Sequence, residues 1–252
     1  MEPKILIFAD FHLGIPDVAS SIEREKKFIH FINKQKNLIE IVILGDLFDF
    51  WFEYKKVVPK GHIRILAKLA DLKEQGVEVT VFTGNHDLWL NDYFPKYLNV
   101  TICHKPQIKN WFGKNFFLAH GDGLGPKDYG YKIMKKCFQN PILKFCFRWI
   151  HPDLGIGLAE YFSRKSRNSH QITDAVYHDD NEWIYQYFLK KSKQLNEIHY
   201  FIFGHRHLPI KKSNGMAQMI VLGDWISQYS YLEITPNNVE LKFLEKNHEI
   251  KN

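Results

Sequence analysis

Short apolar runs recur along this chain, and each closes on a small cluster of Asp, Asn, His or Gly. In chain order they read KILIFADFH, IEIVILGD, VEVTVFTGNHD, NFFLAHGD, IHYFIFGHRH and MIVLGDW. Their length, their Ile, Val and Phe content and the glycine that usually follows are typical of buried β-strands. The chain is therefore expected to fold around a sheet whose strands end in polar side chains.

Helical patterns separate the first of these runs. Residues 22–35 carry an apolar stripe behind the potential caps Ser20 and Ser21, and a second stripe in residues 63–75 stops at Gly76. This alternation of strands and helices predicts parallel strands in an α/β layer fold. Near the end, SYLEITPNNVELKFLE is typical of a β-hairpin that turns at Pro-Asn-Asn.

Residues 124–198 break this rhythm with long helical, basic and aromatic segments. We interpret them as a helical cap inserted into a core that comprises residues 1–123 and 199–252. Between Gly123 and Ala175 there are nine Lys or Arg but only four Asp or Glu, so this stretch carries most of the chain's net charge of +6. Such a local basic field favours an anionic partner: phosphate, nucleic acid or an acidic membrane surface.

The N-terminal segment and the cysteines indicate a compartment. MEPKILIFAD runs directly into the first strand pattern, without the charged and apolar regions of a secretory signal. No apolar run approaches the ~18 residues that a membrane-spanning helix needs. Cys103, Cys137 and Cys146 are odd in number and show no CxxC spacing, which is typical of free thiols in a reducing compartment. We expect a cytoplasmic protein, with peripheral membrane association left open.

Chemically versatile side chains follow the predicted strands, at the ends that open α/β sheets use for function. They are Asp10, His12, Asp46, Asp49, Asn85, His86, Asp87, His120, Asp122, His205 and His207. Each cluster alone has an ordinary explanation, such as a turn, but their coincidence after five successive runs favours one shared site. Carboxylates, imidazoles and an amide oxygen together suit Mn, Fe, Zn or a similar divalent ion. Two such ions about 3.5–4 Å apart serve displacement at phosphorus.

The motifs DFH, GDLFD, GNHD, HGD and GHRH, in this order, resemble the calcineurin-like metallophosphoesterase superfamily. The resemblance implies a two-sheet β-sandwich flanked by helices. It also implies two divalent ions, Mn²⁺ first and Fe²⁺ or Zn²⁺ as alternatives. The ligands that it implies are Asp10, His12 and His207 on one ion, Asn85, His120 and His205 on the other, and Asp46 bridging both.

The same resemblance gives the residue after Asn85 a catalytic role. His86 would face the leaving oxygen of the phosphate, and Asp87 would orient it. The amide of Asn85 and the ring of His86 would also contact the substrate.

A second set of features, GDLFDFWFEY, the basic insertion after HGD, and GHRHLP followed by VLGDW, resembles the UDP-2,3-diacylglucosamine hydrolases of lipid A biosynthesis. These enzymes cleave a pyrophosphate to give UMP and 2,3-diacylglucosamine 1-phosphate. The resemblance implies a nucleotide-sugar lipid substrate and peripheral contact with the inner face of the inner membrane. One departure is His86, because many proteobacterial members of this family have Arg at that position.

The insertion contains side chains that suit such a substrate. Its aromatic residues could cover acyl chains, or they could simply form the cap's own small core. Arg164, Arg167 and Asn168 are the predicted contacts to a nucleotide diphosphate, because Arg side chains fit phosphate oxygens. Asp122 is a predicted acceptor for a sugar or ribose hydroxyl.

Other functions stay as alternatives at this stage. The same chemistry could act on another nucleotide-linked or general phosphodiester. A binding scaffold that has lost catalysis is disfavoured, because no implied ligand is missing from the motifs. Nucleic-acid binding is not expected, since the basic charge lies in a helical cap without a nucleic-acid-binding motif. The oligomeric state is left open.

Overall fold

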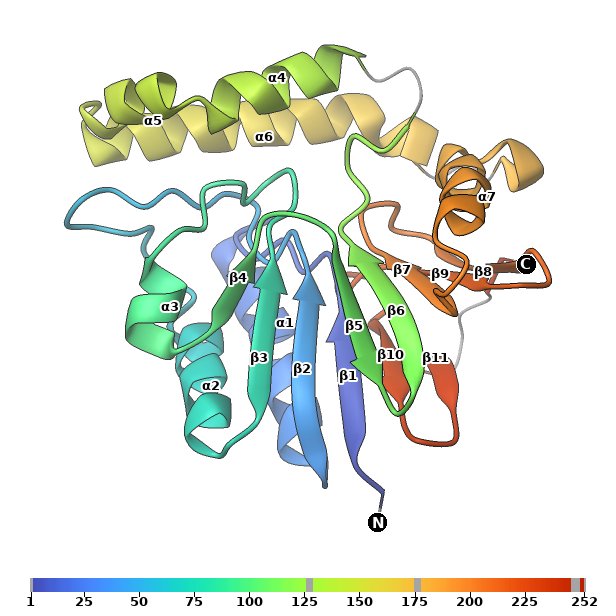
Figure 1. Cartoon of the computed structure of the whole chain (residues 1–252). Coiled ribbons are helices and arrows are strands. Elements are labelled where there is room, and N and C mark those ends of the chain that lie inside the picture. Colours follow the sequence, from blue (N-terminus) through green and yellow to red (C-terminus); the bar gives the residue numbers. More distant parts are fainter. Residues whose placement is uncertain (1, 126–128, 175–177, 246–249, 252) are drawn as a thin grey trace.

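Two β-sheets packed against each other form the centre of the molecule (Figure 1). This computed structural model describes residues 2–125, 129–174, 178–245 and 250–251, and for residues 129–131 and 164–174 it describes the backbone alone. The first sheet has the strand order β11-β10-β1-β2-β3-β4 and the second has the order β5-β6-β7-β9-β8. The expectation of an α/β, two-sheet fold flanked by helices is confirmed.

The first sheet has a parallel half and an antiparallel half. Its strands are β1 (Lys4–Phe8), β2 (Leu38–Leu44), β3 (Glu78–Phe82), β4 (Thr101–Cys103), β10 (Ser230–Ile234) and β11 (Val239–Phe243). The first four pair in parallel, as the strand–helix alternation predicted. β10 runs antiparallel to β1 and forms the expected hairpin with β11.

The second sheet has three parallel strands at its centre and one antiparallel strand at each edge. Its strands are β5 (Gln107–Trp111), β6 (Lys114–Ala119), β7 (Tyr200–Phe203), β8 (Pro209–Ser213) and β9 (Gln218–Leu222). β6, β7 and β9 are parallel, whereas β5 pairs with β6 and β8 pairs with β9 in antiparallel fashion. β1, β2, β3, β6 and β7 therefore supply the carboxyl ends that carry the predicted site.

Helices cover the outer faces of both sheets. They are α1 (Val18–Asn33), α2 (Ile63–Glu74) and α3 (Tyr93–Leu98) beside the first sheet, and α7 (Trp183–Gln194) beside the second. The first helix begins earlier than its stripe suggested: Asp17, not Ser20 or Ser21, is the N-cap, and its side chain accepts a hydrogen bond from the Ser20 backbone N. Gly76, with φ 80°, follows the end of α2 as predicted.

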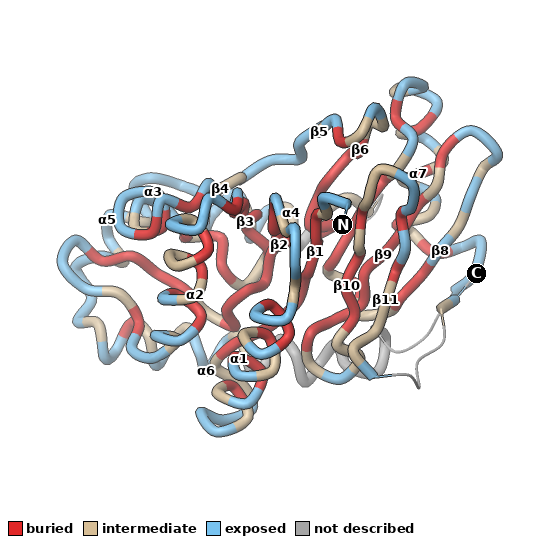
Figure 2. The backbone as a smooth tube through the Cα atoms, turned by 90° about the horizontal axis from the view of Figure 1, so that it is seen from below, coloured by how far each residue is buried: buried red, intermediate tan, exposed pale blue. Residues whose placement is uncertain are grey.

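Three apolar layers hold the core together. Figure 2 shows that central strands such as β1, β2 and β9 are buried along most of their lengths, whereas the edge strands β4 and β5 are not. One layer lies between the sheets, where Val42 of β2 and Ile202 of β7 belong to the same cluster. A second lies between the first sheet and its helices, and the third lies between the second sheet and α7. Burial on both faces explains why the strands read as nearly continuous apolar runs.

A cap of three helices lies across the edge of the sheets where the parallel strands end (Figure 1). Its helices are α4 (Tyr129–Gln139), α5 (Pro141–Arg148) and α6 (Pro152–Asp174), and a 3-10 turn, η1 (Asp179–Asn181), precedes α7. α7 packs differently: its Ile184 and Phe188 are fully buried in the cluster that contains Phe201 and Phe203 of β7. The predicted insertion of residues 124–198 thus combines a cap with a helix that packs as part of the core.

The cap touches the core through aromatic side chains. The ring centroid of Phe147 on α5 lies 4.6 Å from that of Phe52 and 5.2 Å from that of Trp89. Trp89 also donates its indole N–H to the backbone O of Phe138 on α4, at 2.7 Å. Among the described helices, none is long and apolar enough to cross a membrane.

Candidate metal centre

The ends of β1, β2, β3, β6 and β7 bring the predicted ligands together beneath the cap. Two groups of side chains place their ligand atoms within 4.8 Å of one another: Asp10, His12 and His207 in the first, and Asp46, His120 and His205 in the second. The same distance also groups His12 and Asp46 with His86. Because the strands belong to both sheets, the site sits at the junction of the two halves of the fold.

Asp46 belongs to the second group and also lies close to His12 of the first. Its Oδ2 is 3.5 Å from His12 Nε2 and 3.4 Å from His120 Nε2. His120 Nε2 also lies 3.2 Å from the amide oxygen of Asn85. These distances place Asp46 between His12 and His120, and Asn85 beside His120. The bridging role that the resemblance implies for Asp46 stays a prediction.

The backbone around these ligands is unusual. Asp10, His12, Asp46, His205 and His207 all have φ between 43° and 68°, in the left-handed region that residues other than glycine rarely adopt. Hydrogen bonds tie these loops to one another: the backbone N of residue 12 donates to the carbonyl of residue 46, and that of residue 204 to the carbonyl of residue 120. Backbone strain of this kind persists only where many surrounding contacts hold the conformation in place. It is found most often at functional sites.

In three of the histidines, Nδ1 faces an oxygen acceptor. His120 Nδ1 lies 2.6 Å from the carbonyl oxygen of Leu44, and His207 Nδ1 lies 3.4 Å from Asp224 Oδ2. His12 Nδ1 lies 3.5 Å from Asp49 Oδ1. Since oxygen acceptors hold the proton on Nδ1, Nε2 is left as the nitrogen that can bind a metal.

The charges in the site compete strongly. Burial lowers the pKa of His120, but the neighbouring carboxylates, Asp46 foremost, raise it to about 10. Burial and the charge on His120 lower the pKa of His205 to about 4. Burial would raise the pKa of Asp46, but His120 and His86 hold it well below its ordinary value. The buried carboxylates thus require positive charge beside them, whether from protons or from cations.

The donor set fits divalent metal ions. Asp10 is fully buried, and its Oδ1 has no hydrogen-bond partner among the described atoms, as expected of an atom that binds a cation. Gly84 is needed here because a Cβ at this position would overlap Asp46 Oδ1. Buried carboxylates, imidazoles and one amide oxygen make a mixed nitrogen and oxygen site of the kind that Mn, Fe and Zn occupy.

The order and geometry of these clusters agree with a known family. The sequence profile of the calcineurin-like phosphoesterases matches residues 3–209. The chain belongs to the calcineurin-like phosphoesterase family. The predicted resemblance is confirmed, and membership of this family supports divalent metals as cofactors.

Relatives extend the likeness to nearly the whole chain. The UDP-2,3-diacylglucosamine hydrolase of Porphyromonas gingivalis is 34% identical over 249 residues, covering 92% of this chain and 94% of the relative. The enzyme of the same name from Yersinia pestis is 28% identical over 242 residues, covering 94% of this chain and 97% of the relative. Family and relatives together identify a metal-dependent phosphoester hydrolase.

Solved structures agree on the fold. An archaeal phosphodiesterase matches with a TM-score of 0.51 at 12% identity, covering 96% of this chain and 99% of that structure. TT1561 of Thermus thermophilus matches with a TM-score of 0.50 at 11% identity, covering 97% of this chain and all of that structure. At such identities the likeness confirms the metallophosphoesterase fold and nothing finer.

Within this phosphoesterase site, His86 is held by both the core and the cap. Its backbone N donates to Asp46 Oδ1 at 2.9 Å, and its Nδ1 lies 3.1 Å from the carbonyl oxygen of Asp49. Ser163 Oγ, from α6, lies 2.9 Å from the same Nδ1 and 3.0 Å from Asp49 Oδ2. A carbonyl only accepts, so Nδ1 carries a proton. The predicted contact of His86 with the phosphate stays a prediction.

The carboxylate of Asp87 bonds to backbone rather than to the His86 ring in the described contacts. It accepts hydrogen bonds from the N–H groups of Gly84 at 2.7 Å, Leu47 at 2.8 Å and Phe48 at 3.4 Å. Burial and the charge of Asp46 raise the pKa of Asp87 to about 7. Asp87 therefore orders the loops around His86, and its predicted role in orienting the ring itself stays a prediction.

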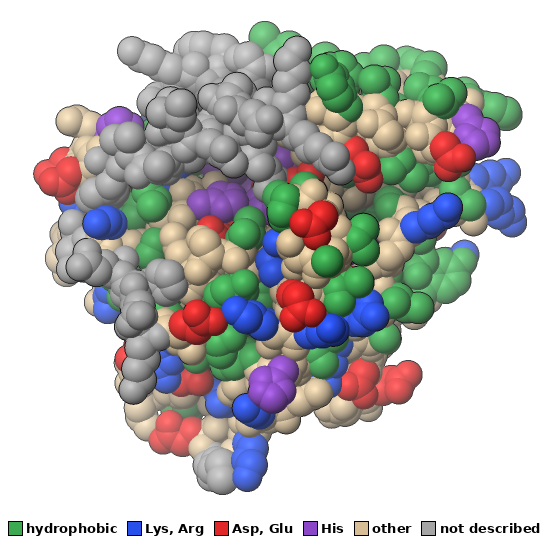
Figure 3. Space-filling view, turned by 180° about the vertical axis from the view of Figure 1, so that it is seen from behind, with side chains coloured by type: hydrophobic (Ala, Val, Ile, Leu, Met, Phe, Trp, Pro, Cys, Tyr) green, Lys and Arg blue, Asp and Glu red, His purple; other side chains and the backbone are tan. Residues whose placement is uncertain are grey.

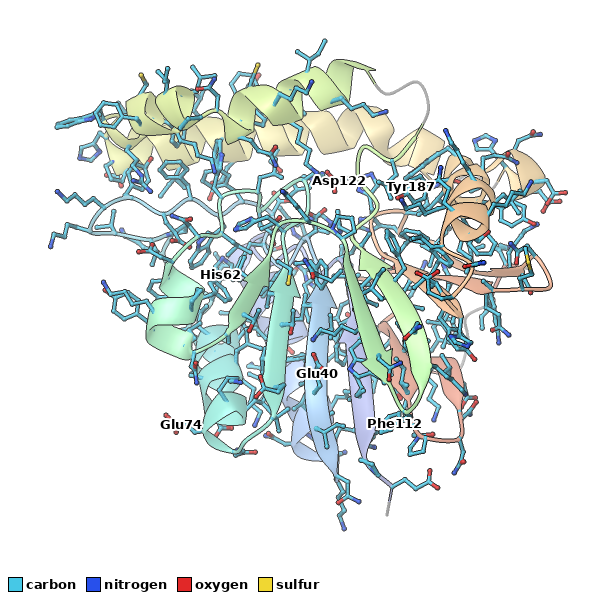
Figure 4. The ribbon with its side chains drawn as sticks, viewed as in Figure 1. Glu40, His62, Glu74, Phe112, Asp122 and Tyr187 are labelled. Carbon is cyan, nitrogen blue, oxygen red and sulfur yellow. The ribbon has the colours of Figure 1, made fainter. Side chains whose placement is uncertain are left out.

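The predicted substrate contacts divide into described and undescribed side chains. Asp122 is buried at the end of β6 beneath the cap (Figure 4), and its carboxylate pairs with Lys135 of α4. Burial would raise the pKa of Asp122, but His120 and Lys135 lower it. Arg164, Arg167 and Asn168 lie outside the side chains that the structure describes.

Sequence reasoning named Asp49 without giving it a role, and it missed Ser163 and the contact between Asp224 and His207. Asp49 was visible as the last residue of GDLFD, three positions after Asp46, but its role depends on the fold of that loop. Ser163 carries no signal in a helix that contains several serines. Asp224 accepts a hydrogen bond from the backbone N of Ser227 at 2.7 Å, and its Oδ2 also lies 3.4 Å from His207 Nδ1.

Proposed function

We propose that this chain hydrolyses UDP-2,3-diacylglucosamine to UMP and 2,3-diacylglucosamine 1-phosphate, using two divalent ions, Mn²⁺ in the first place. The observation that carries the proposal is the extent of the likeness: the relatives of that name align with the cap as well as the core. A lipid-linked substrate needs both, because the core holds the phosphates and a cover must shield the acyl chains.

The reaction adds water across one phosphoric anhydride bond of the substrate. The oxygen of water joins one phosphorus, the bond to the bridging oxygen breaks, and that oxygen leaves on the other phosphate with a proton. Bound cations would polarise the phosphoryl oxygens and supply the activated water. His86 lies next to Asp46, and the Asp49 carbonyl accepts the proton on its Nδ1. As an imidazolium, the ring carries a second proton on Nε2, which would stabilise the departing oxygen or be transferred to it.

Aromatic side chains at the junction of cap and core support an acylated substrate. Phe52, Tyr54, Trp89 and Phe147 form one cluster next to the site, with centroid distances from 4.6 to 6.3 Å. Of these, Phe147 belongs to the cap and the others to core loops, so acyl chains could be held between the two. Asp122, beneath the same cap, offers the carboxylate that we assign to a sugar or ribose hydroxyl.

The outer side of the cap supports contact with a membrane surface. Ile142 and Phe145 on α5 and Trp149, the C-cap of this helix, are spaced three and four residues apart, and their exposed fractions are 70%, 61% and 78%. Figure 3 shows hydrophobic side chains gathered along the cap at the top of the molecule. An exposed apolar helix face with Lys and Arg beside it is suited to lie at a lipid interface. We infer a cytoplasmic protein attached to the inner face of the inner membrane.

A direct assay tests the proposed reaction. Purified protein with Mn²⁺ is incubated with UDP-2,3-diacylglucosamine, and the products are separated, identified and quantified by mass spectrometry. We expect UMP and 2,3-diacylglucosamine 1-phosphate in equal amounts. Incubation in ¹⁸O-labelled water identifies the phosphorus that was attacked. Absence of UMP with Mn²⁺, Fe²⁺ and Zn²⁺ alike would rule the proposal out.

A second candidate keeps the chemistry and changes the substrate. His86 favours it, because many proteobacterial members of the UDP-2,3-diacylglucosamine hydrolase family have Arg there. In that case the chain would act on another nucleotide-linked or general phosphodiester. Comparable kcat/KM for an aryl phosphodiester and for the lipid would favour this reading, whereas a strong preference for the lipid would favour the first.

A further inference from the structure

A buried ion pair joins the loop between β7 and β8 to the start of α7. Arg206 Nε lies 2.7 Å from Glu182 Oε1, and a terminal nitrogen of the same guanidinium lies 3.2 Å from Oε2. Arg206 is 5% exposed and Glu182 is 1% exposed. A two-point contact of this kind fixes the direction of both groups as well as their distance.

The backbone on either side of Arg206 has a strained conformation. His205 and His207, on either side of it, have φ of 68° and 49° in the left-handed region. The backbone N of His205 donates to Asp10 Oδ2 at 2.8 Å, and the carbonyl of His207 accepts from Gln228 Nε2 at 2.8 Å. Arg206 provides the anchor between these two points, at the centre of the strained stretch.

The other end of the ion pair is itself well fixed. Glu182 directly precedes α7, and its carbonyl accepts the backbone N of Gln186 at 3.0 Å. Its Oε2 also lies 3.3 Å from the backbone N of His178. Phe188, further along α7, is fully buried, with its ring centroid 5.3 Å from that of Phe201 on β7. Glu182 therefore moves with the core and not with the cap.

We propose that Arg206 is a positioning residue whose ion pair with Glu182 holds His205 and His207 at the metal centre. The inference rests on the proposed role of both histidines as metal ligands. Stability alone explains the pair poorly, because well-packed apolar residues often replace a buried ion pair without loss of stability. The arrangement of the loop, by contrast, depends on the two-point contact.

The test separates stability from metal binding. In the double variant Glu182→Leu/Arg206→Met, apolar side chains of similar volume replace both charges. The metal-free proteins are compared by thermal unfolding in EDTA, and Mn²⁺ binding is then measured by equilibrium dialysis. We expect an unfolding temperature close to that of the wild type but about ten-fold weaker Mn²⁺ binding, at the lower end of the effect of outer-shell changes. Wild-type affinity in a folded double variant would overturn the proposal.

Two further variants complete the experiment. Lys212→Met removes an exposed ion pair with Asp179 and Asp180 on the nearby η1 turn, and should bind Mn²⁺ as the wild type does. Arg206→Lys keeps the charge but loses the two-point contact of the guanidinium with Glu182, so it should fold and bind Mn²⁺ more weakly than the wild type. Unchanged Mn²⁺ binding in this variant would overturn the proposal even if the double variant does not fold. A failed ligand assignment is distinguishable, because His207→Ala would then bind Mn²⁺ like the wild type.

Discussion

His12 Nε2 lies 3.1 Å from His207 Nε2, although 195 residues separate the two histidines in sequence. The Nδ1 of each ring faces a carboxylate, Asp49 in one case and Asp224 in the other. With both protons on Nδ1, the two Nε2 atoms point lone pairs at each other, which is favourable only when a positive charge lies beside them. Asp10 Oδ1, 3.5 Å from His207 Nε2, completes a set of donors for that charge.

The first prediction concerns this pair. His207→Ala removes one donor from the group that contains Asp10 and His12, so we expect loss of about one equivalent of bound metal and a large loss of hydrolysis. Metal analysis by mass spectrometry after dialysis measures the stoichiometry. His151→Ala, a histidine with a 68% exposed side chain on the cap, is the matched control and should retain full metal. Two equivalents in His207→Ala would contradict the assignment.

The second prediction concerns removal of the metals. Without cations, the buried carboxylates of Asp10 and Asp46 lose the partners that their position requires. EDTA should therefore lower the unfolding temperature as well as abolish activity, and Mn²⁺ should restore both. At a free metal concentration of 100 times Kd, the expected stabilisation is about 2.7 kcal/mol. Calorimetry of the same preparation with EDTA and with Mn²⁺ checks this, and identical transitions would argue against a buried cation site.

The third prediction separates proton transfer from metal binding at His86. His86→Ala should lower turnover by about 10²–10⁴-fold, the usual range for a general acid or base. Its metal content should stay near the wild-type value, because the ligand set that the family resemblance implies does not include His86. Steady-state kinetics and metal analysis on one preparation provide both numbers. Loss of metal from this variant would instead assign His86 to the grouping with His12 and Asp46.

The fourth prediction distinguishes loop order from direct catalysis at Asp87. The two carboxylate oxygens of Asp87 accept hydrogen bonds from the backbone N–H groups of Gly84 and Leu47. In Asp87→Asn, the amide NH₂ replaces one of these oxygens, so two donors face each other and one hydrogen bond is lost. We expect the free energy of unfolding to fall by about 1–3 kcal/mol, with a smaller loss of kcat than in His86→Ala. Urea unfolding measures the first quantity. Asp71→Asn, at a half-exposed carboxylate on α2, is the control. A kcat loss equal to that of His86→Ala at unchanged stability would show that Asp87 acts on the ring.

The strands and the position of the site were predictable because one pattern determines both. A parallel strand buried on two faces reads as an apolar run, and the polar group that follows it must lie at the sheet edge. Asp10, Asp46 and His120 could therefore be grouped without coordinates. The division into two sheets was different: it came from the resemblance, since β3 and β6 show the same local pattern although they lie in different sheets.

What escaped prediction depends on contacts between distant segments. The stripe of α7 resembles that of a cap helix, and only its packing on β7 assigns it to the core. Ser163 reaches His86 across 77 residues because the cap folds over the strand ends. Asp49 faces His12 and His86 only after its loop has folded around them. A pattern along the chain records burial and periodicity, and it does not record which loops meet.

The last prediction concerns the outer face of the cap. Phe145 on α5 and Trp149, the C-cap of that helix, are both exposed, with their ring centroids 6.1 Å apart. Replacing both by Ser removes apolar area that would enter a lipid interface. We expect the double variant to bind anionic phospholipid vesicles at least about ten-fold more weakly, since two buried aromatic side chains account for more than 1.4 kcal/mol. Its rate on a soluble aryl phosphodiester should be unchanged. Tyr97→Ser, which removes an aromatic residue with 64% exposure from α3, is the control for a general loss of surface aromatics. Sedimentation with vesicles measures binding, and equal sedimentation of the double variant and the wild type would place the membrane contact elsewhere.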